Sequence, residues 1–130
     1  MLNKPSNEQQ NIINQIIANN IIVDAVAGSG KTTTILHIAL KYVKLKILVV
    51  TYNTKLRLET LNKIQELQLK IIEVQTYHGF CTKYYQDNCK NDNQIINILN
   101  MDTKLRKKIK YDMLIVDEAQ DMTTIYYQLI

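Results

Sequence analysis

The sequence predicts an α/β fold in which helices cover both faces of a parallel β-sheet. Short apolar segments rich in β-branched residues alternate along the chain with longer segments whose apolar residues recur at helical spacing. Parallel neighbours require crossover connections, which helices usually provide, so this alternation favours a parallel sheet. A glycine-rich loop follows the first apolar segment and adjacent carboxylates follow the last, as expected where ligands bind at the carboxyl ends of strands.

The first predicted elements precede and follow the glycine-rich loop. After Pro5, with Ser6 or Asn7 as N-cap, a helix is predicted because isoleucines recur at helical spacing, at Ile12, Ile13, Ile16 and Ile17. Residues 20–26, "NIIVDAV", then form a short β-branched segment that predicts a buried strand. Residues 31–43, "KTTTILHIALKYV", predict the helix that follows the loop.

The same alternation continues to the end of the chain. Strands are predicted over residues 46–52, 70–76 and 111–117, and a long helix over residues 54–67. A further helix is predicted to begin near residue 78, with short helices around residues 95–99 and 103–109 and another beginning within residues 122–130.

Length and composition are those of one compact domain with a packed core. The chain has 130 residues, of which 46% are hydrophobic and 22% charged. Its net charge of +4 is compatible with an anionic partner but does not identify one. No apolar run is long enough for a bilayer and no leader pattern is present, so we expect a soluble intracellular protein of the cytoplasm or nucleus, without membrane association.

Two further features are expected to be structural. Cys81 and Cys89 have no C-x-x-C spacing, and we expect free thiols that are buried or idle. The lysine-rich residues 104–110, "KLRKKIK", are expected to form the solvated face of a helix rather than a binding patch.

Residues 25–32, "AVAGSGKT", match the phosphate-binding pattern G-x-x-x-x-G-K-[ST], except that Ala25 holds the first position. Glycines allow backbone N–H groups to surround phosphate oxygens, and the following helix directs its positive end at them. Lys31 would reach the β- and γ-phosphates, and the Thr32 hydroxyl would bind Mg²⁺. The alternative is a strand-to-helix turn without a ligand. The predicted ATP-binding residues of this segment are Ala27, Gly28, Ser29, Gly30, Lys31, Thr32 and Thr33.

The segment "YDMLIVDEAQD" is an apolar strand that ends in adjacent carboxylates. Asp117 can hold Mg²⁺, and Glu118 can orient and deprotonate a water molecule for attack on the γ-phosphate. The alternative is an exposed acidic turn. We therefore predict ATP and Mg²⁺ as cofactors, with Lys31 and Glu118 as the catalytic residues.

The segments "AVAGSGKTTT" and "LIVDEAQD" resemble motifs I and II of UvrD/Rep-type superfamily 1 DNA helicases. "PSNEQQNII" resembles the Q motif of that family, in which a glutamine reads adenine; Gln9 aligns best and Gln10 is the close alternative. The resemblance implies a P-loop NTPase with a RecA-like sheet, which hydrolyses MgATP to translocate on single-stranded DNA and unwind duplex.

Two further segments resemble the motifs that line the DNA path in that family. "VVTYNTK" resembles motif Ia, and "VQTYHGF" resembles motif Ib. The resemblance implies that Tyr52 stacks on a base and that Asn53, Lys55, Thr76 and His78 contact the strand. Such stacking and backbone contacts hold single strands without sequence preference. Alternatively, Tyr52 and Tyr77 are packing residues and His78 a satisfied polar group. Five residues match no motif and are expected to pack in the core or on the surface: His37, Tyr84, Tyr85, Tyr126 and Tyr127.

The resemblance covers residues 9–121 and corresponds to the first lobe of a two-lobed helicase, so residues 1–130 are expected to be one ATP-binding domain, incomplete after motif II. A second lobe, in cis or in trans, would supply the arginines that complete the γ-phosphate site, because Arg57 and Arg106 stand in no recognised motif. We therefore expect this chain to bind nucleotide with little turnover. The alternatives are a non-catalytic nucleotide or single-strand-binding module, a truncated gene product, or another P-loop enzyme such as a small kinase or an RNA helicase.

Overall fold

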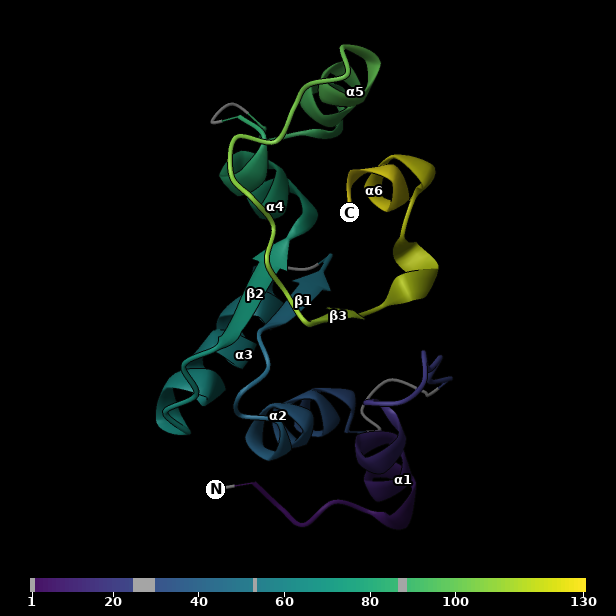
Figure 1. Ribbon diagram of the computed structural model, residues 1–130, viewed down its shortest axis with the longest axis vertical. Helices are drawn as coiled ribbons and strands as arrows, with labels where there is room; N and C mark the ends of the chain where they lie inside the picture. Colours follow the sequence, from purple (N-terminus) through teal and green to yellow (C-terminus); the bar gives the residue numbers. More distant parts are fainter. Residues whose placement is uncertain (1, 25–29, 53, 87–88) are drawn as a thin grey trace.

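The computed structural model describes residues 2–24, 30–52, 54–86 and 89–130 of the chain. Within these residues, helices alternate with three β-strands (Figure 1). In chain order the elements are α1 (Asn7–Gln15), α2 (Lys31–Lys41), β1 (Ile47–Thr51), α3 (Thr54–Glu66), β2 (Ile72–Thr76), α4 (Tyr77–Tyr84), α5 (Asp92–Asn100), β3 (Met113–Val116), the 3₁₀ turn η1 (Ala119–Asp121) and α6 (Thr124–Leu129). None of the helices in these described ranges is long and apolar enough to span a membrane.

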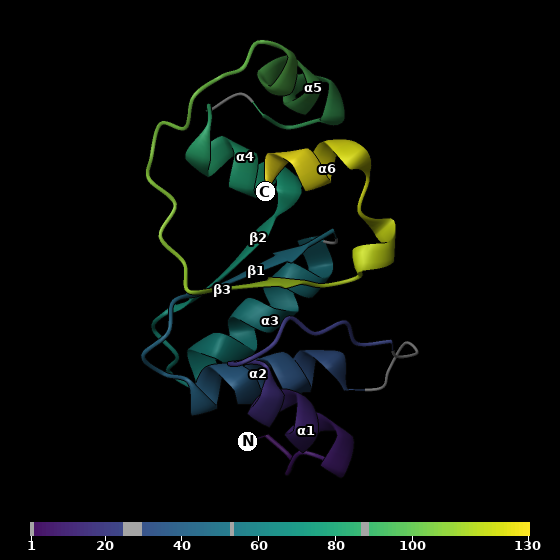
Figure 2. The same ribbon diagram turned by 45° about the vertical axis from the view of Figure 1, so that its right-hand side comes forward.

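The three strands form a parallel sheet in the order β2-β1-β3. Helices α1, α2 and α3 lie on one side of this sheet and α4, α5 and α6 on the other (Figures 1 and 2). The predicted α/β architecture, a parallel sheet flanked by helices on both faces, is confirmed. The central strand β1 is buried along its whole length because both of its edges and both of its faces are covered.

The two faces of β1 divide the core into two clusters. Ile47 and Val49 point to the side of α1, α2 and α3, where they pack with Leu36 and Ile64. The alternate residues of β1 face the opposite side of the sheet, because successive side chains of a strand point to opposite faces. Leu48 and Val50 accordingly pack among residues of α4, α5 and α6, which include Tyr77, Phe80, Ile95, Tyr126 and Leu129.

Local capping chemistry explains where α1 and α5 begin. Ser6 caps α1 by accepting a hydrogen bond from the backbone N–H of Gln9, whose side chain accepts one from the Ser6 backbone. Asn91 and Gln94 make the same reciprocal pair at the start of α5. Each box satisfies donors that a helix end leaves free, so both helices begin where the sequence places a capping residue.

The strand predicted over residues 20–26 is not present in the part of it that the structure describes. Residues 20–24 carry no strand, and Ala25 and Val26 lie outside the described residues. Ile22 is 97% exposed and Val23 47% exposed, so these side chains do not enter the core. The β-branched composition identified residues able to form a strand, but a strand also needs a hydrogen-bonded neighbour, and residues 20–24 have none in the sheet of β2, β1 and β3.

The helix predicted over residues 103–109 is also absent, since this segment runs as an irregular chain between α5 and β3 (Figure 2). Its polar groups bond to other elements instead of to a helical neighbour. The Arg106 backbone N–H donates to the Tyr84 carbonyl at 2.8 Å, and Nε of Arg106 donates to the Lys83 carbonyl at 3.1 Å. The lysines of residues 104–110 are solvent-exposed, as expected, although they do not share a helix face.

The expectation of free thiols at Cys81 and Cys89 is wrong, because the structure joins these residues in a disulfide. Cys81 lies in α4 and Cys89 precedes α5, and both are completely buried. Their Cα atoms lie 6.0 Å apart, a separation that a disulfide spans. The spacing of eight residues concealed this proximity, because it fits no cysteine motif.

Candidate functional site

The carboxyl ends of the three strands bring distant segments together around Thr51, the last residue of β1. In the parallel register, Thr51 pairs with Thr76 of β2. On its other side, the backbone N–H of Asp117 donates to the Val50 carbonyl at 2.9 Å, so Asp117 continues from β3 beside Thr51. Asp117 and the segments predicted to contact a nucleic-acid strand therefore lie at the same edge of the sheet.

An ion pair joins the start of α2 to the turn after β3. Lys31, the first residue of α2, places its Nζ 2.9 Å from Oε1 of Glu118. The two side chains remain about one quarter exposed, at 25% and 27%, so a ligand in solvent can reach both. The structure thus brings together the lysine of the glycine-rich loop and a carboxylate that lies 87 residues away in the sequence.

The electrostatics of these groups differ in sign. The hydrogen bond from Lys31 is the main reason why the pKa of Glu118 is lowered, and the same bond raises the pKa of Lys31. Asp117 behaves oppositely: its burial, together with the neighbouring Glu118 charge, raises its pKa, while Lys31 and a hydrogen bond from Thr51 oppose the shift. A half-buried carboxylate next to a second one is a site that gains from a bound cation.

Gly30 immediately precedes α2 and has a left-handed backbone, with φ of +88°. Its carbonyl accepts hydrogen bonds from the Thr34 hydroxyl at 2.9 Å and from Nε2 of Gln9 at 3.1 Å. Gln10 instead donates to Asn14 at 3.0 Å along α1. Of the two glutamines considered for adenine recognition, Gln9 is the one that contacts the end of the loop.

The remaining predicted nucleotide-binding residues are only partly described. Thr32 and Thr33 lie in the first turn of α2 with intermediate exposure, so their hydroxyls are placed where a ligand at the helix start could meet them. Ala27, Gly28 and Ser29 lie outside the described residues, as does Asn53 of the predicted strand-contact set.

The other predicted strand-contact residues gather at the ends of β1 and β2. Tyr52 directly follows β1 and is 57% exposed, and Lys55 lies exposed in the first turn of α3. The Thr76 hydroxyl caps α4 by accepting from the Gly79 N–H at 3.0 Å. Nε2 of His78, in α4, lies 2.9 Å from Oδ1 of Asp92.

Tyr77 is a packing residue, since it is 2% exposed. Its hydroxyl is buried and has no hydrogen-bond partner among the described residues. Burial, and then the charge of Asp117, raise the pKa of Tyr77. Tyr77 therefore lies within electrostatic range of Asp117.

Two residues that the sequence patterns did not single out belong to this edge of the sheet. Tyr126 of α6 lies between Tyr52 and His78, with ring centroids 6.2 Å and 5.8 Å away respectively. Asp92, the first residue of α5, bonds to both Tyr126 and His78. Neither residue stands in a motif. The only signal in the sequence was that Tyr126 follows the Asp117–Glu118 pair by a few residues.

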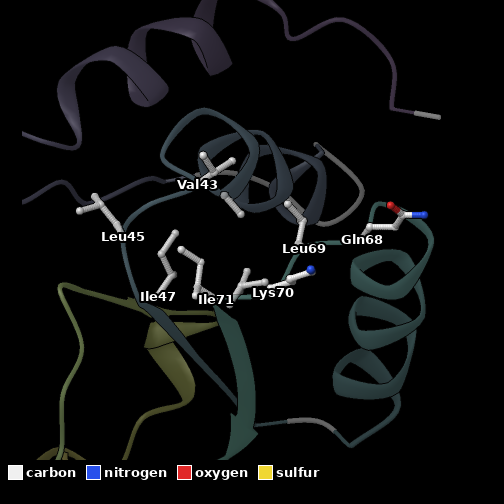
Figure 3. A pocket seen from close by; sticks show the side chains of 9 residues that line it. Val43, Leu45, Ile47, Gln68, Leu69, Lys70 and Ile71 are labelled. Atoms are coloured by element: carbon white, nitrogen blue, oxygen red, sulfur yellow. The ribbon is translucent and has the colours of Figure 1, made fainter.

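A pocket lies at the opposite end of the strands and plays no part in this arrangement (Figure 3). It has a volume of about 240 Å³ and is lined mainly by apolar residues, among them Val43, Leu45, Ile47 and Ile71. Ile47 is the first residue of β1, whereas the ion pair and Asp117 lie beyond the last residues of β1 and β3. The shape of the pocket and the chemistry of the polar site are thus separate features.

A parallel sheet with a lysine at the start of a helix, held against a carboxylate turn at the strand ends, defines the class of P-loop nucleotide-binding domains. A family model described as an AAA domain matches residues 9–130, and the chain belongs to this family. The family accounts for the α/β sheet and indicates nucleotide binding. Comparison with curated proteins and with solved structures gives no significant match.

Proposed function

We propose that the chain is the ATP-binding first lobe of a superfamily 1 DNA helicase of the UvrD/Rep type, with a RecA-like sheet as its scaffold. The observation that carries this proposal is the 2.9 Å contact between Lys31 and Glu118, which joins the motif I and motif II resemblances in space. Tyr52 and His78 lie near one another at this edge of the sheet, which supports single-stranded DNA as the partner that the family resemblance implies.

Lys31 is proposed to exchange partners when ATP binds. Its ammonium group now contacts Glu118, and the β- and γ-phosphate oxygens are competing acceptors with greater negative charge. When Lys31 turns to phosphate, Glu118 loses the main cause of its lowered pKa. Its carboxylate then becomes a better base for the proton of an attacking water molecule, so one movement binds substrate and releases the base.

Oxygen donors of this chain fit a magnesium ion. Among the described residues, no three side chains of His, Cys, Asp and Glu form a metal cluster, and Mg²⁺ does not need one, because it takes one or two protein oxygens together with phosphate oxygens and water. Asp117, with a pKa raised by burial and by Glu118, and the Thr32 hydroxyl would hold it. The ion would neutralise charge that develops on the β- and γ-phosphate oxygens.

The chain's two arginines support low turnover by this lobe alone. Nε of Arg57 donates to the Val74 carbonyl at 3.1 Å, and Nε of Arg106 donates to the Lys83 carbonyl at 3.1 Å. Both arginines therefore bond to the backbone of β2 or α4. An arginine that stabilises the transferring phosphoryl group accounts for about 10³–10⁵ in rate, and we propose that a second lobe, in cis or in trans, supplies it.

ATP hydrolysis by the purified chain, with and without a single-stranded oligonucleotide, tests this assignment against Lys31→Ala and Glu118→Gln. We expect the wild type to bind MgATP and to hydrolyse it little faster than Glu118→Gln does. We expect Lys31→Ala to lose MgATP binding. Robust hydrolysis stimulated by single-stranded DNA would disprove the need for a second lobe.

The same observation about the arginines also favours a second candidate, a non-catalytic nucleotide and single-strand-binding module. The two candidates differ in what a second lobe does. If an added lobe that carries the later helicase motifs restores DNA-stimulated turnover, the first holds; if turnover stays at the level of Glu118→Gln, the second does.

A further inference from the structure

Three rings surround Tyr126, a residue of α6 that matches no helicase motif. Its ring stacks on that of Tyr77, with centroids 4.4 Å apart and planes 8° from parallel. The Tyr52 ring leans over it at 6.2 Å with a tilt of 54°, and the His78 ring approaches edge-on at 5.8 Å. Tyr126 is 2% exposed whereas Tyr52 is 57% exposed, so a buried ring supports an exposed one.

The hydroxyl end of Tyr126 is held as firmly as its ring. It donates to Oδ1 of Asp92 at 2.6 Å, and the same carboxylate oxygen lies 2.9 Å from Nε2 of His78. One oxygen of α5 therefore links residues of α4 and α6. The hydrogen bond from Tyr126, followed by that from His78, lowers the pKa of Asp92 despite some burial, which keeps the acceptor ionised.

Packing alone does not require this hydroxyl. A phenylalanine at residue 126 could fill the same place on Tyr77 without a polar atom to satisfy, whereas tyrosine must find a partner when buried. That partner, Asp92, is the residue that also bonds to His78. Tyr126 thus fixes the support for Tyr52 through its ring and the orientation of His78 through its hydroxyl.

We infer that Tyr126, with Asp92, is a positioning residue for single-stranded DNA, which holds Tyr52 ready to stack on a base and His78 ready to contact the strand. This inference rests on the proposed DNA-binding role of Tyr52 and His78. Tyr126 follows the Asp117–Glu118 turn by a single 3₁₀ turn and the start of α6, so the support comes from the segment next to the nucleotide-site carboxylates. The partner must present bases, because a backbone without bases offers nothing for Tyr52 to stack on.

The test measures affinity of the full chain for a fluorescently labelled oligothymidylate by anisotropy at low salt. Base stacking sets the expected loss in Tyr52→Ala at about ten-fold. Tyr126→Leu removes the support and should weaken binding about three- to ten-fold, the range associated with ordering one large side chain. Tyr127→Leu is the matched control, since Tyr127 is the adjacent residue of α6, is 69% exposed, and should bind as the wild type does.

The decisive readout is a double-mutant cycle. If the ring of Tyr126 acts through Tyr52, Tyr126→Leu causes a smaller loss in the Tyr52→Ala background than in the wild type, because only the part that the hydroxyl transmits through Asp92 and His78 remains. MgATP affinity should stay at the wild-type level in every variant. An equal loss in both backgrounds would overturn the inference. An oligonucleotide of abasic sites gives a second check, because Tyr126→Leu should lose less affinity for it than for the oligothymidylate.

Tyr126→Phe covers the case in which Tyr126→Leu does not fold. It keeps the stack on Tyr77 and removes only the bond to Asp92, so we expect a loss of about three-fold that disappears in the His78→Ala background. The same loss in both backgrounds would contradict the role of the hydroxyl. Wild-type affinity in Tyr52→Ala, or no binding by the wild type, would refute the DNA part of the proposed function itself, whereas a loss in Tyr52→Ala with none in Tyr126→Leu refutes only the inference.

Discussion

Replacing Gly30 with alanine should destabilise the chain at the junction between the glycine-rich loop and α2. Gly30 has φ of +88°, and an L-residue with a side chain pays about 1–2 kcal/mol for a left-handed backbone. An added Cβ would lie 2.7 Å from Nε2 of Gln9, so the Gln9 amide must move and lose its bond to the Gly30 carbonyl. That bond contributes about 0.5–1.5 kcal/mol, which brings the expected loss to about 1.5–3.5 kcal/mol.

Urea unfolding of Gly30→Ala, Gln9→Ala and the double variant measures these two contributions separately. Once Gln9→Ala has removed the amide, Gly30→Ala should cost only the backbone strain of about 1–2 kcal/mol. A loss below about 0.5 kcal/mol in Gly30→Ala would refute the left-handed conformation. Strict additivity of the two substitutions would refute the contact between Gln9 and Gly30.

Four further predictions concern the two carboxylates, the disulfide and the core. Asp117→Asn should raise the free energy of unfolding at pH 7. Because the pKa of Asp117 is raised in the folded state, the ionised carboxylate destabilises the fold at neutral pH. In urea unfolding between pH 4 and 8, the difference in unfolding free energy between Asp117→Asn and the wild type should shrink as the pH falls. Glu118 has a lowered pKa, so its contribution is present above its ordinary range and is lost on acidification; Glu118→Gln should flatten the acid limb of the same profile, and an unchanged limb would contradict the ion pair. Reducing the Cys81–Cys89 disulfide should lower the free energy of unfolding by about 2–3 kcal/mol, as loop closure predicts, with a Cys81→Ser/Cys89→Ser variant that does not respond to reductant as control. Leu36→Ala should cost about 2–5 kcal/mol by calorimetry or urea unfolding, because Leu36 is completely buried between α2 and the sheet, and a loss below about 1 kcal/mol would contradict that packing.

The sequence predicted those features that local patterns determine. Helix α1 begins after Ser6 because a capping residue precedes a run of helically spaced isoleucines, and β1 is buried because five consecutive apolar or β-branched residues suit a central strand. The lysine and the carboxylates were identified by motif, and the structure brings Lys31 within 2.9 Å of Glu118.

Features that depend on tertiary partners could not be predicted. Residues 20–24 have the composition of a strand, yet composition does not provide a neighbour, and Ile22 remains almost fully exposed. The basic residues 103–109 have helical spacing, but Arg106 bonds to α4 instead. The pairing of Cys81 with Cys89 and the place of Tyr126 beneath Tyr52 arise only when α4, α5 and α6 pack against one another.

The most direct test of the central claim is calorimetric titration of MgATP into the wild-type chain, Lys31→Ala and Lys44→Ala. Lys44 is an exposed lysine in the turn after α2, so its variant controls for the loss of one positive charge. The account predicts saturable binding to the wild type and to Lys44→Ala, and loss of that binding in Lys31→Ala. No binding by the wild type, or equal binding by Lys31→Ala, would contradict a nucleotide site at the start of α2.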